Sequence, residues 1–194
     1  MSDRAEISIR RAEPGDYEAL HRIFTSPKLV RGTLQLPFPS LETWRKRLAE
    51  PAEGIFSLVA CAGGEVVGEI TLHTSPTRWR RRHAGEIGMA VRDDWQGRGV
   101  GTALMLAVID LAENWLNLTR LELIVYADNE PAIGLYKKCG FVVEGTMKDW
   151  SFRDGEYADC LSMARLTGVH AIPDRSTRGA RYPNLPMQEE ADSA

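Results

Sequence analysis

The sequence contains no apolar run approaching the roughly 20 residues that a helix needs to cross a bilayer. Its first six residues are polar and acidic, without the apolar segment of a secretory signal. The net charge of −3 at pH 7 gives no general basic character of the kind that nucleic-acid-binding proteins carry. We therefore expect a cytoplasmic protein that binds neither membranes nor nucleic acid.

Cysteine and histidine are also scarce. The three cysteines, Cys61, Cys139 and Cys160, are far apart and form no C-x-x-C pair. This number and spacing favour reduced thiols over a disulfide framework. The four histidines lack the spacing of a metal site, so we predict no bound metal.

The apolar pattern divides residues 6–166 into one domain of alternating strands and helices. Strands are predicted at 6–11, 55–62, 65–73, 84–91, 119–127, 141–147 and 156–166, and helices at 14–24, 40–49, 100–114 and 129–139. Hairpins come early and β-α-β units late, which predicts an α/β fold of the mixed α+β kind, with a largely antiparallel sheet and helices on both faces. The domain spans 1–166, and residues 167–194 are a polar tail, which we expect to be mobile or to contact a partner.

The strongest local signal follows the strand at 84–91. Residues 96–102 read Gln-Gly-Arg-Gly-Val-Gly-Thr and open a helix. Glycines allow the backbone to turn its N–H groups inward, and a helix N-terminus adds a positive dipole, so the segment suits a phosphate or pyrophosphate. A Walker loop is absent, and a dinucleotide fingerprint fails because Thr102 or Leu104 stands where its third glycine belongs. A strand–helix turn without a ligand remains the alternative.

Two motifs together resemble the GNAT acetyltransferase family. Gln96-x-x-Gly99-x-Gly101 matches its Q/R-x-x-G-x-G/A signature, and Asn129-x-x-Ala132-x-x-x-Tyr136 followed by Gly140-Phe141 matches a second motif downstream. The resemblance covers about residues 6–166. It implies the GNAT fold, a six- to seven-stranded, mostly antiparallel sheet with about four helices and a splayed central strand pair.

The resemblance also implies that acetyl-CoA is the cofactor. The backbone around the glycines would hold its pyrophosphate, the end of the strand at 84–91 and Asn129 would hold its pantetheine arm, and a backbone N–H near Val91 would polarise the thioester carbonyl. The implied cofactor-binding residues are Met89, Ala90, Val91, Gln96, Gly97, Arg98, Gly99, Val100, Gly101, Thr102, Asn129, Ala132 and Tyr136.

Two residues are candidates for proton transfer. An amine is mostly protonated at pH 7 and must lose a proton before it attacks, so a base is needed. Glu86, on the strand at 84–91, is the candidate base, acting directly or through water; the alternative is a solvated strand residue. Tyr136 occupies the family position for protonating the departing thiolate; the alternative is a core tyrosine that anchors its helix.

The acceptor is less well defined by the sequence. The Thr33-Leu34-Gln35 loop and the segment Arg153-x-Gly155-x-Tyr157-x-Asp159 resemble the bacterial branch that acts on free L-amino acids or small amines. Substrate contacts are predicted at Gln35, Phe38, Glu86 and Tyr157. Two alternatives remain, a protein N-terminal acetyltransferase with similar C-terminal strands and a coenzyme-binding sensor without turnover. A homodimer is compatible with this fold.

Overall fold

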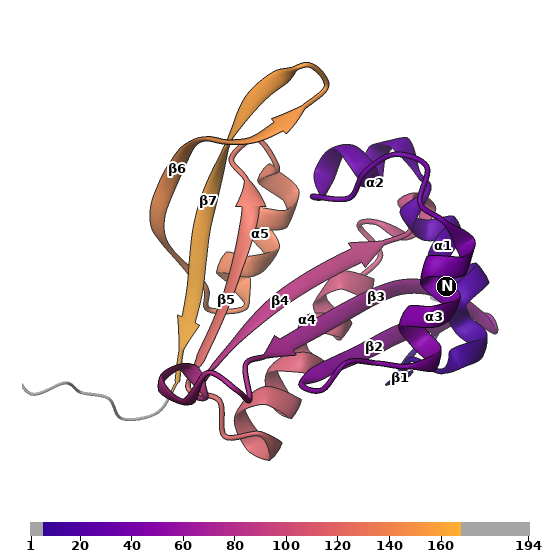
Figure 1. The fold of residues 1–194 in the computed structure, drawn as a ribbon, viewed down its shortest axis with the longest axis horizontal. Coiled ribbons are helices and arrows are strands. Elements are labelled where there is room, and N and C mark those ends of the chain that lie inside the picture. Colours follow the sequence, from indigo (N-terminus) through magenta and orange to yellow (C-terminus); the bar gives the residue numbers. More distant parts are fainter. Residues whose placement is uncertain (1–5, 168–194) are drawn as a thin grey trace, which may run out of the picture.

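The computed structural model describes residues 6–167, so that all of the predicted tail except Thr167 lies outside the described residues. Figure 1 shows one sheet with helices packed against it. The strands are β1 (Ile7–Arg11), β2 (Ile55–Ala62), β3 (Glu65–Thr74), β4 (Ala84–Val91), β5 (Arg120–Tyr126), β6 (Val142–Arg153) and β7 (Glu156–Leu166). The helices are α1 (Tyr17–Phe24), α2 (Pro27–Gly32), α3 (Leu41–Ala49), α4 (Val100–Asp110) and α5 (Glu130–Lys138), with 3₁₀ turns at Pro14–Asp16, Trp79–Arg81 and Asp93–Trp95 and a π-helical turn at Leu111–Trp115.

The sheet has the order β1-β2-β3-β4-β5-β7-β6, and only the β4–β5 pair is parallel. The prediction of a mixed, mostly antiparallel sheet is therefore confirmed. The β2–β3 hairpin turns at Gly63-Gly64, where both residues have positive φ, as the tight turn requires.

The central strands β4 and β5 separate after a short paired stretch, as predicted. They pair only where Ala84–Glu86 faces Arg120–Glu122. Beyond that point β4 stays bonded to β3 up to Val91, whereas β5 stays bonded to β7 up to Tyr126. Each strand follows its own half of the twisted sheet, so the two halves diverge in a V (Figure 1). The edge of β4 from Ile87 onward is left without a strand partner.

Two apolar clusters lie on opposite faces of the sheet. The larger cluster joins α4 and α5 to strand residues such as Ile70, Leu72 and Leu123. The smaller cluster packs α1, α2 and α3 against Val59 and Ala90. Because side chains alternate along a strand, Ala90 and Glu86 project to the face of the smaller cluster, and Met89 projects to the other.

Two elements differ from the sequence prediction. Residues 26–39 were predicted to be a loop, but Pro27–Gly32 forms α2, which makes five α-helices where about four were expected. Ser26 caps this helix by accepting a hydrogen bond from the Leu29 N–H, and Pro27 occupies its first turn, where proline is tolerated. Strand β6 continues to Arg153 instead of ending near 147, because two irregularities bend it without ending its pairing with β7.

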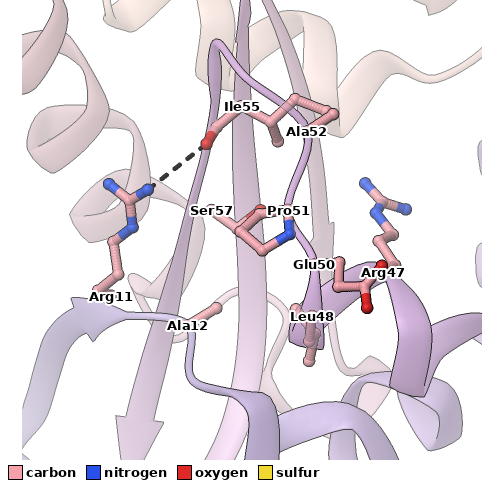
Figure 2. A pocket seen from close by; sticks show the side chains of 9 residues that line it. All are labelled: Arg11, Ala12, Arg47, Leu48, Glu50, Pro51, Ala52, Ile55 and Ser57. Atoms are coloured by element: carbon pink, nitrogen blue, oxygen red, sulfur yellow. Dashed lines mark hydrogen bonds between the residues drawn. The ribbon is translucent and has the colours of Figure 1, made fainter.

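A buried carboxyl group lies on the face of the smaller cluster. Glu69 of β3 is 3% exposed, and Thr71 and Ser57 continue a polar line across β3 and β2, with 3.2 Å between their hydroxyl oxygens. Thr71 donates a hydrogen bond to Glu69. Ser57 also lines a cavity of about 180 Å³ between β1, β2 and the end of α3, in which Arg11 donates to the Ile55 carbonyl (Figure 2). Burial raises the pKa of Glu69 because it disfavours the charged form.

Glu69→Gln is expected to stabilise the protein at neutral pH. Since the folded-state pKa of Glu69 lies above its unfolded value, the stability that this group contributes is fully present below the unfolded pKa and is lost as pH rises toward the folded one. The variant should therefore melt within error of the wild type at pH 4 and about 2–8 °C higher at pH 8, a shift that corresponds to about 1 kcal/mol. Thermal unfolding across this pH range measures the effect, with Glu65→Gln at the exposed start of β3 as control. An equal shift at both pH values would contradict it.

Candidate active site

The glycine loop between β4 and α4 has the geometry of an anion site. Gly97 and Gly99 have φ of 72° and 93°, and the space where their side chains would be is open. The helix opens at Val100, and its first hydrogen bond of the α-helical type runs from the Ala103 N–H to the Gly99 carbonyl. The preceding N–H groups therefore have no carbonyl partner within the helix. These free donors at a helix N-terminus fit the pyrophosphate of a CoA molecule.

Gln96 holds this loop in place through its side chain. Its amide nitrogen donates to the Val91 carbonyl at the end of β4 and to Asp93, both at 3.2 Å, and its amide oxygen accepts from Lys28 at 2.7 Å. The structure thus uses Gln96 to fasten the loop to β4 and to α2. The Arg98 guanidinium stacks on Trp95, with 5.1 Å between its central carbon and the ring centre, and Thr102 is exposed.

The face of the V beside α4 and α5 suits a narrow chain. A side chain added at Gly101 would lie 2.9 Å from Leu135 Cδ2 of α5 and 3.6 Å from Met89 Cε of β4. The three elements therefore converge beside the unpaired edge of β4, where backbone N–H and C=O groups are available to the amides of a pantetheine arm. A side chain at position 101 would narrow this approach unless the end of the Leu135 side chain moved away.

Asn129 is the N-cap of α5, and Tyr136 lies near the C-terminal end of the same helix. Asn129 accepts a hydrogen bond from the Ala132 N–H at 3.3 Å and so caps the helix, while its amide nitrogen lies 3.8 Å from the side-chain position of Gly32. Tyr136 is 8% exposed and its ring packs 6.1 Å from that of Phe141. Its hydroxyl makes no hydrogen bond with another residue of the described range. Every buried polar side-chain atom of that range has a hydrogen-bond partner, so the Tyr136 hydroxyl must be accessible from the surface.

Burial raises the pKa of Tyr136 to about 12, with a smaller contribution from Cys139. The hydroxyl is therefore protonated at every physiological pH. A protonated hydroxyl without a hydrogen-bond partner in the protein can donate to a ligand, which is the property that an acid for a departing thiolate needs.

Glu86 lies on the opposite face of the V, where the acceptor would approach. Its side chain is exposed and forms no ion pair within residues 6–167, and it is paired in register with His73 of β3. The pKa of His73 is lowered, mainly by burial and also by Arg47, with Glu86 opposing. Sequence reasoning missed His73 because only the β3–β4 register places it beside Glu86.

The other predicted substrate residues are exposed, and they lie in the connection between α2 and α3 and on β7. Phe38 is 98% exposed and Gln35 is exposed, both in the connection between α2 and α3. Tyr157 is 69% exposed and packs edge-on against Phe152, with ring centres 5.3 Å apart. Tyr126 pairs with Cys160, and Ala158 lies on the same face as Cys160 because side chains alternate along β7. Tyr157 precedes Ala158, so its ring lies on the other face of the sheet, opposite to Glu86.

Within the part of the chain that the structure describes, no group of His, Cys, Asp and Glu side chains is arranged to hold a metal ion. No helix in that part is long and apolar enough to cross a membrane.

A splayed β4–β5 pair with a glycine-rich anion loop at the start of α4 is the architecture expected from the two sequence motifs. The family model "Acetyltransferase (GNAT) family" matches residues 17–141. The chain belongs to this family and is an acetyl-CoA-dependent N-acetyltransferase.

Similar proteins extend this result. The chain is 47% identical to the L-amino acid N-acetyltransferase AaaT of Escherichia coli (strain K12) over 162 residues, which is 84% of this chain and 99% of that enzyme. It is 28% identical to the spermidine N(1)-acetyltransferase of the same organism, covering 84% of this chain and 87% of that enzyme. Among solved structures, ribosomal-protein-alanine N-acetyltransferase from Brucella melitensis superposes with a TM-score of 0.73 at 27% identity, covering 82% of this chain and 99% of that one.

Proposed function

We propose that this enzyme acetylates the α-amine of a free L-amino acid or a close analogue, by direct transfer in a ternary complex. The observation that carries the proposal is the similarity to an L-amino acid N-acetyltransferase, which extends over 99% of that enzyme. A polyamine acceptor is the weaker alternative, because the identity to a spermidine N(1)-acetyltransferase is 28%, against 47% to the L-amino acid enzyme.

Acetyl-CoA, when bound, supplies the acetyl group as a thioester and leaves as the free thiol of CoA. The loop at Gln96–Thr102 would hold its pyrophosphate, and the unpaired edge of β4 near Val91 would position the thioester. Glu86 accepts the proton that the acceptor ammonium must lose, directly or through water, so that the amine nitrogen can form its bond to the acetyl carbon. Tyr136 would donate its hydroxyl proton to the sulfur as the carbon–sulfur bond breaks. The proton that the acetylated nitrogen loses would return to Tyr136 through solvent, and the ammonium proton held by Glu86 would leave to solvent.

The test is thiol release from acetyl-CoA with a panel of the twenty L-amino acids, methionine sulfoximine, phosphinothricin, spermidine and short peptides with free N-termini. Turnover on free amino acids or their analogues alone is the expected result. Turnover on peptides alone would replace the proposal with protein N-terminal acetylation. Silence across the panel, with acetyl-CoA binding retained in calorimetry, would leave an amine outside the panel or a coenzyme sensor.

Two further properties belong to this proposal. The cysteines are free thiols, two of them buried, which is consistent with work in the reducing cytoplasm. The outer edge of β6 has no strand partner within residues 6–167 and carries the exposed Val142 and Val143, a surface that a second copy could cover in a homodimer. Light scattering after size exclusion distinguishes a dimer from a monomer.

A further inference from the structure

The short helix α2 crosses the open end of the V (Figure 1). At its start, the Ser26 hydroxyl donates to Asp93, and Lys28 donates to Gln96 at 2.7 Å. Both partners belong to the segment that follows β4. The N-terminal end of α2 is therefore fastened to the β4 side of the V and to the loop assigned to the coenzyme pyrophosphate.

The other end of α2 is fastened to the β5 side through Arg153 of the β6–β7 hairpin. The Arg153 guanidinium donates to the Arg31 carbonyl at 3.2 Å and to both oxygens of Asp128, at 2.6 and 3.3 Å. It stacks on Tyr126 at 4.2 Å from the ring centre. Arg31 in turn forms an ion pair with Asp154 at the hairpin tip. We call these contacts of Arg153, Asp128, Arg31 and Asp154 the Arg153 clamp.

The strand spacing, the length of α2 and the length of an extended peptide indicate how α2 and the Arg153 clamp affect the acceptor. Paired strands lie about 4.8 Å apart, as β4 and β5 do at Glu86. Six helical residues rise about 9 Å, roughly twice the spacing of paired strands, and the side chains of Lys28 and Arg153 extend the reach of α2 at its two ends. An extended peptide advances about 3.3–3.6 Å per residue, so a tetrapeptide of about 13–14 Å that runs toward the open end of the V meets this bridge, whereas a single amino acid fits inside the V.

The contacts of Arg153 are held together more firmly than an ordinary surface ion pair. An isolated exposed pair contributes little, and Asp128 and Asp154 have side chains that are 60% and 57% exposed. The Arg153 side chain, by contrast, is only 14% exposed and is oriented at once by an aromatic ring, a carboxylate and a backbone carbonyl. Its planar fork matches this set of partners in a way that a lysine cannot.

We propose that α2 and the Arg153 clamp restrict the acceptor to small free amines and that Arg153 is a specificity-determining residue. The inference rests on the proposed function, because it explains how a chain of this fold excludes polypeptide N-termini. Arg153 acts by holding α2 across the opening and does not itself transfer a proton. Breaking the clamp frees the C-terminal end of α2 and admits a longer acceptor.

The test compares kcat/KM for a free amino acid with kcat/KM for a tetrapeptide that begins with the same residue. In Arg153→Gln and Asp128→Asn, the peptide-to-amino-acid ratio is expected to rise about tenfold or more, a size typical of discrimination by the shape of a site. The KM for the amino acid should rise more than kcat falls, and acetyl-CoA affinity should stay unchanged. Arg153→Lys should restore only part of the discrimination.

The matched control is Arg81→Gln, which removes an ion pair to Glu122 at the closed end of the V. It should leave the ratio at the wild-type value. If Arg153→Gln does not fold, Asp154→Asn at the exposed hairpin tip replaces it as a test of the clamp, because it removes the ion pair with Arg31. An unchanged ratio in folded Asp128→Asn and Asp154→Asn would overturn the inference while leaving amino acid acetylation intact. A wild-type enzyme that already prefers the peptide would instead overturn the proposed function.

Discussion

Replacing Glu86 with glutamine is expected to lower kcat by about 10²–10⁴-fold, the usual contribution of a general base. The exchange keeps the size of the side chain but replaces the basic carboxylate with an amide, which is too weakly basic to take the ammonium proton. Glu86 is exposed and free of ion pairs within the described range, so the loss has no obvious structural cost. Steady-state thiol release gives kcat, and calorimetry with acetyl-CoA should show an unchanged Kd.

Glu122→Gln is the control for this prediction. Glu122 faces Glu86 in the β4–β5 register, but Arg81 and Arg120 both donate to its carboxylate. Each carboxylate oxygen of Glu122 already accepts from a guanidinium group, so neither is free to approach an acceptor amine. Glu122→Gln should therefore change kcat far less than Glu86→Gln. Equal losses of kcat in the two variants would show that Glu86 is not the base. The combined negative charge of the two carboxylates would then be the property that supports the reaction.

Tyr136→Phe is expected to lower kcat by about 10²-fold while changing acetyl-CoA affinity little. The phenylalanine keeps the ring that packs near Phe141, and no hydrogen bond to another described residue is lost with the hydroxyl. Because the pKa of Tyr136 is raised to about 12, the wild-type hydroxyl stays protonated below about pH 11. A basic limb of the wild-type pH–rate profile below pH 10 must then belong to another group.

Single-turnover kinetics with acetyl-CoA in both enzymes separates this loss from product release. Tyr17→Phe, on α1 and hydrogen-bonded to Glu18, is a control for removing a tyrosine hydroxyl elsewhere. If kcat of Tyr136→Phe equalled that of the wild type, Tyr136 would be a core residue that anchors α5. A lower melting temperature together with lost coenzyme binding would support the same reading.

Much of the local structure could be predicted because its causes are local. Gly63-Gly64 requires a tight hairpin, Asn129 caps α5, and the glycines at 97 and 99 permit the positive φ of the anion loop. Strand β4 was predicted with its observed bounds, 84–91, because its apolar residues are bounded by a basic loop and by the acidic pair that opens the next turn. The missed helix α2 also had a local signal, a serine cap followed by proline, but the surrounding prolines and glycines favoured a loop.

The predictions that stayed incomplete depend on how distant segments pair. The alternation along β4 placed Glu86 on a face, but the β3–β4 register was needed to place His73 beside it. Tyr157 was grouped with the substrate residues by its sequence motif, whereas its place in the β6–β7 register turns its ring to the opposite face from Glu86. The burial of Glu69 depends on the packing of α1 against β3, and the sequence alone gives no reason to expect a charged residue in an alternating strand to be buried.

The sequence by itself determined the family, the cofactor and the order of the strands, because turns, caps and the glycine loop depend on residues within a few positions of one another. Only the tertiary structure decided which side chains meet across the V. Arg31, Asp128 and Arg153 are separated by up to 122 residues in the chain, and the sheet order together with the divergence of β4 and β5 brings them into one clamp. Such contacts depend on strand register and sheet twist, which arise from the packing of the whole domain.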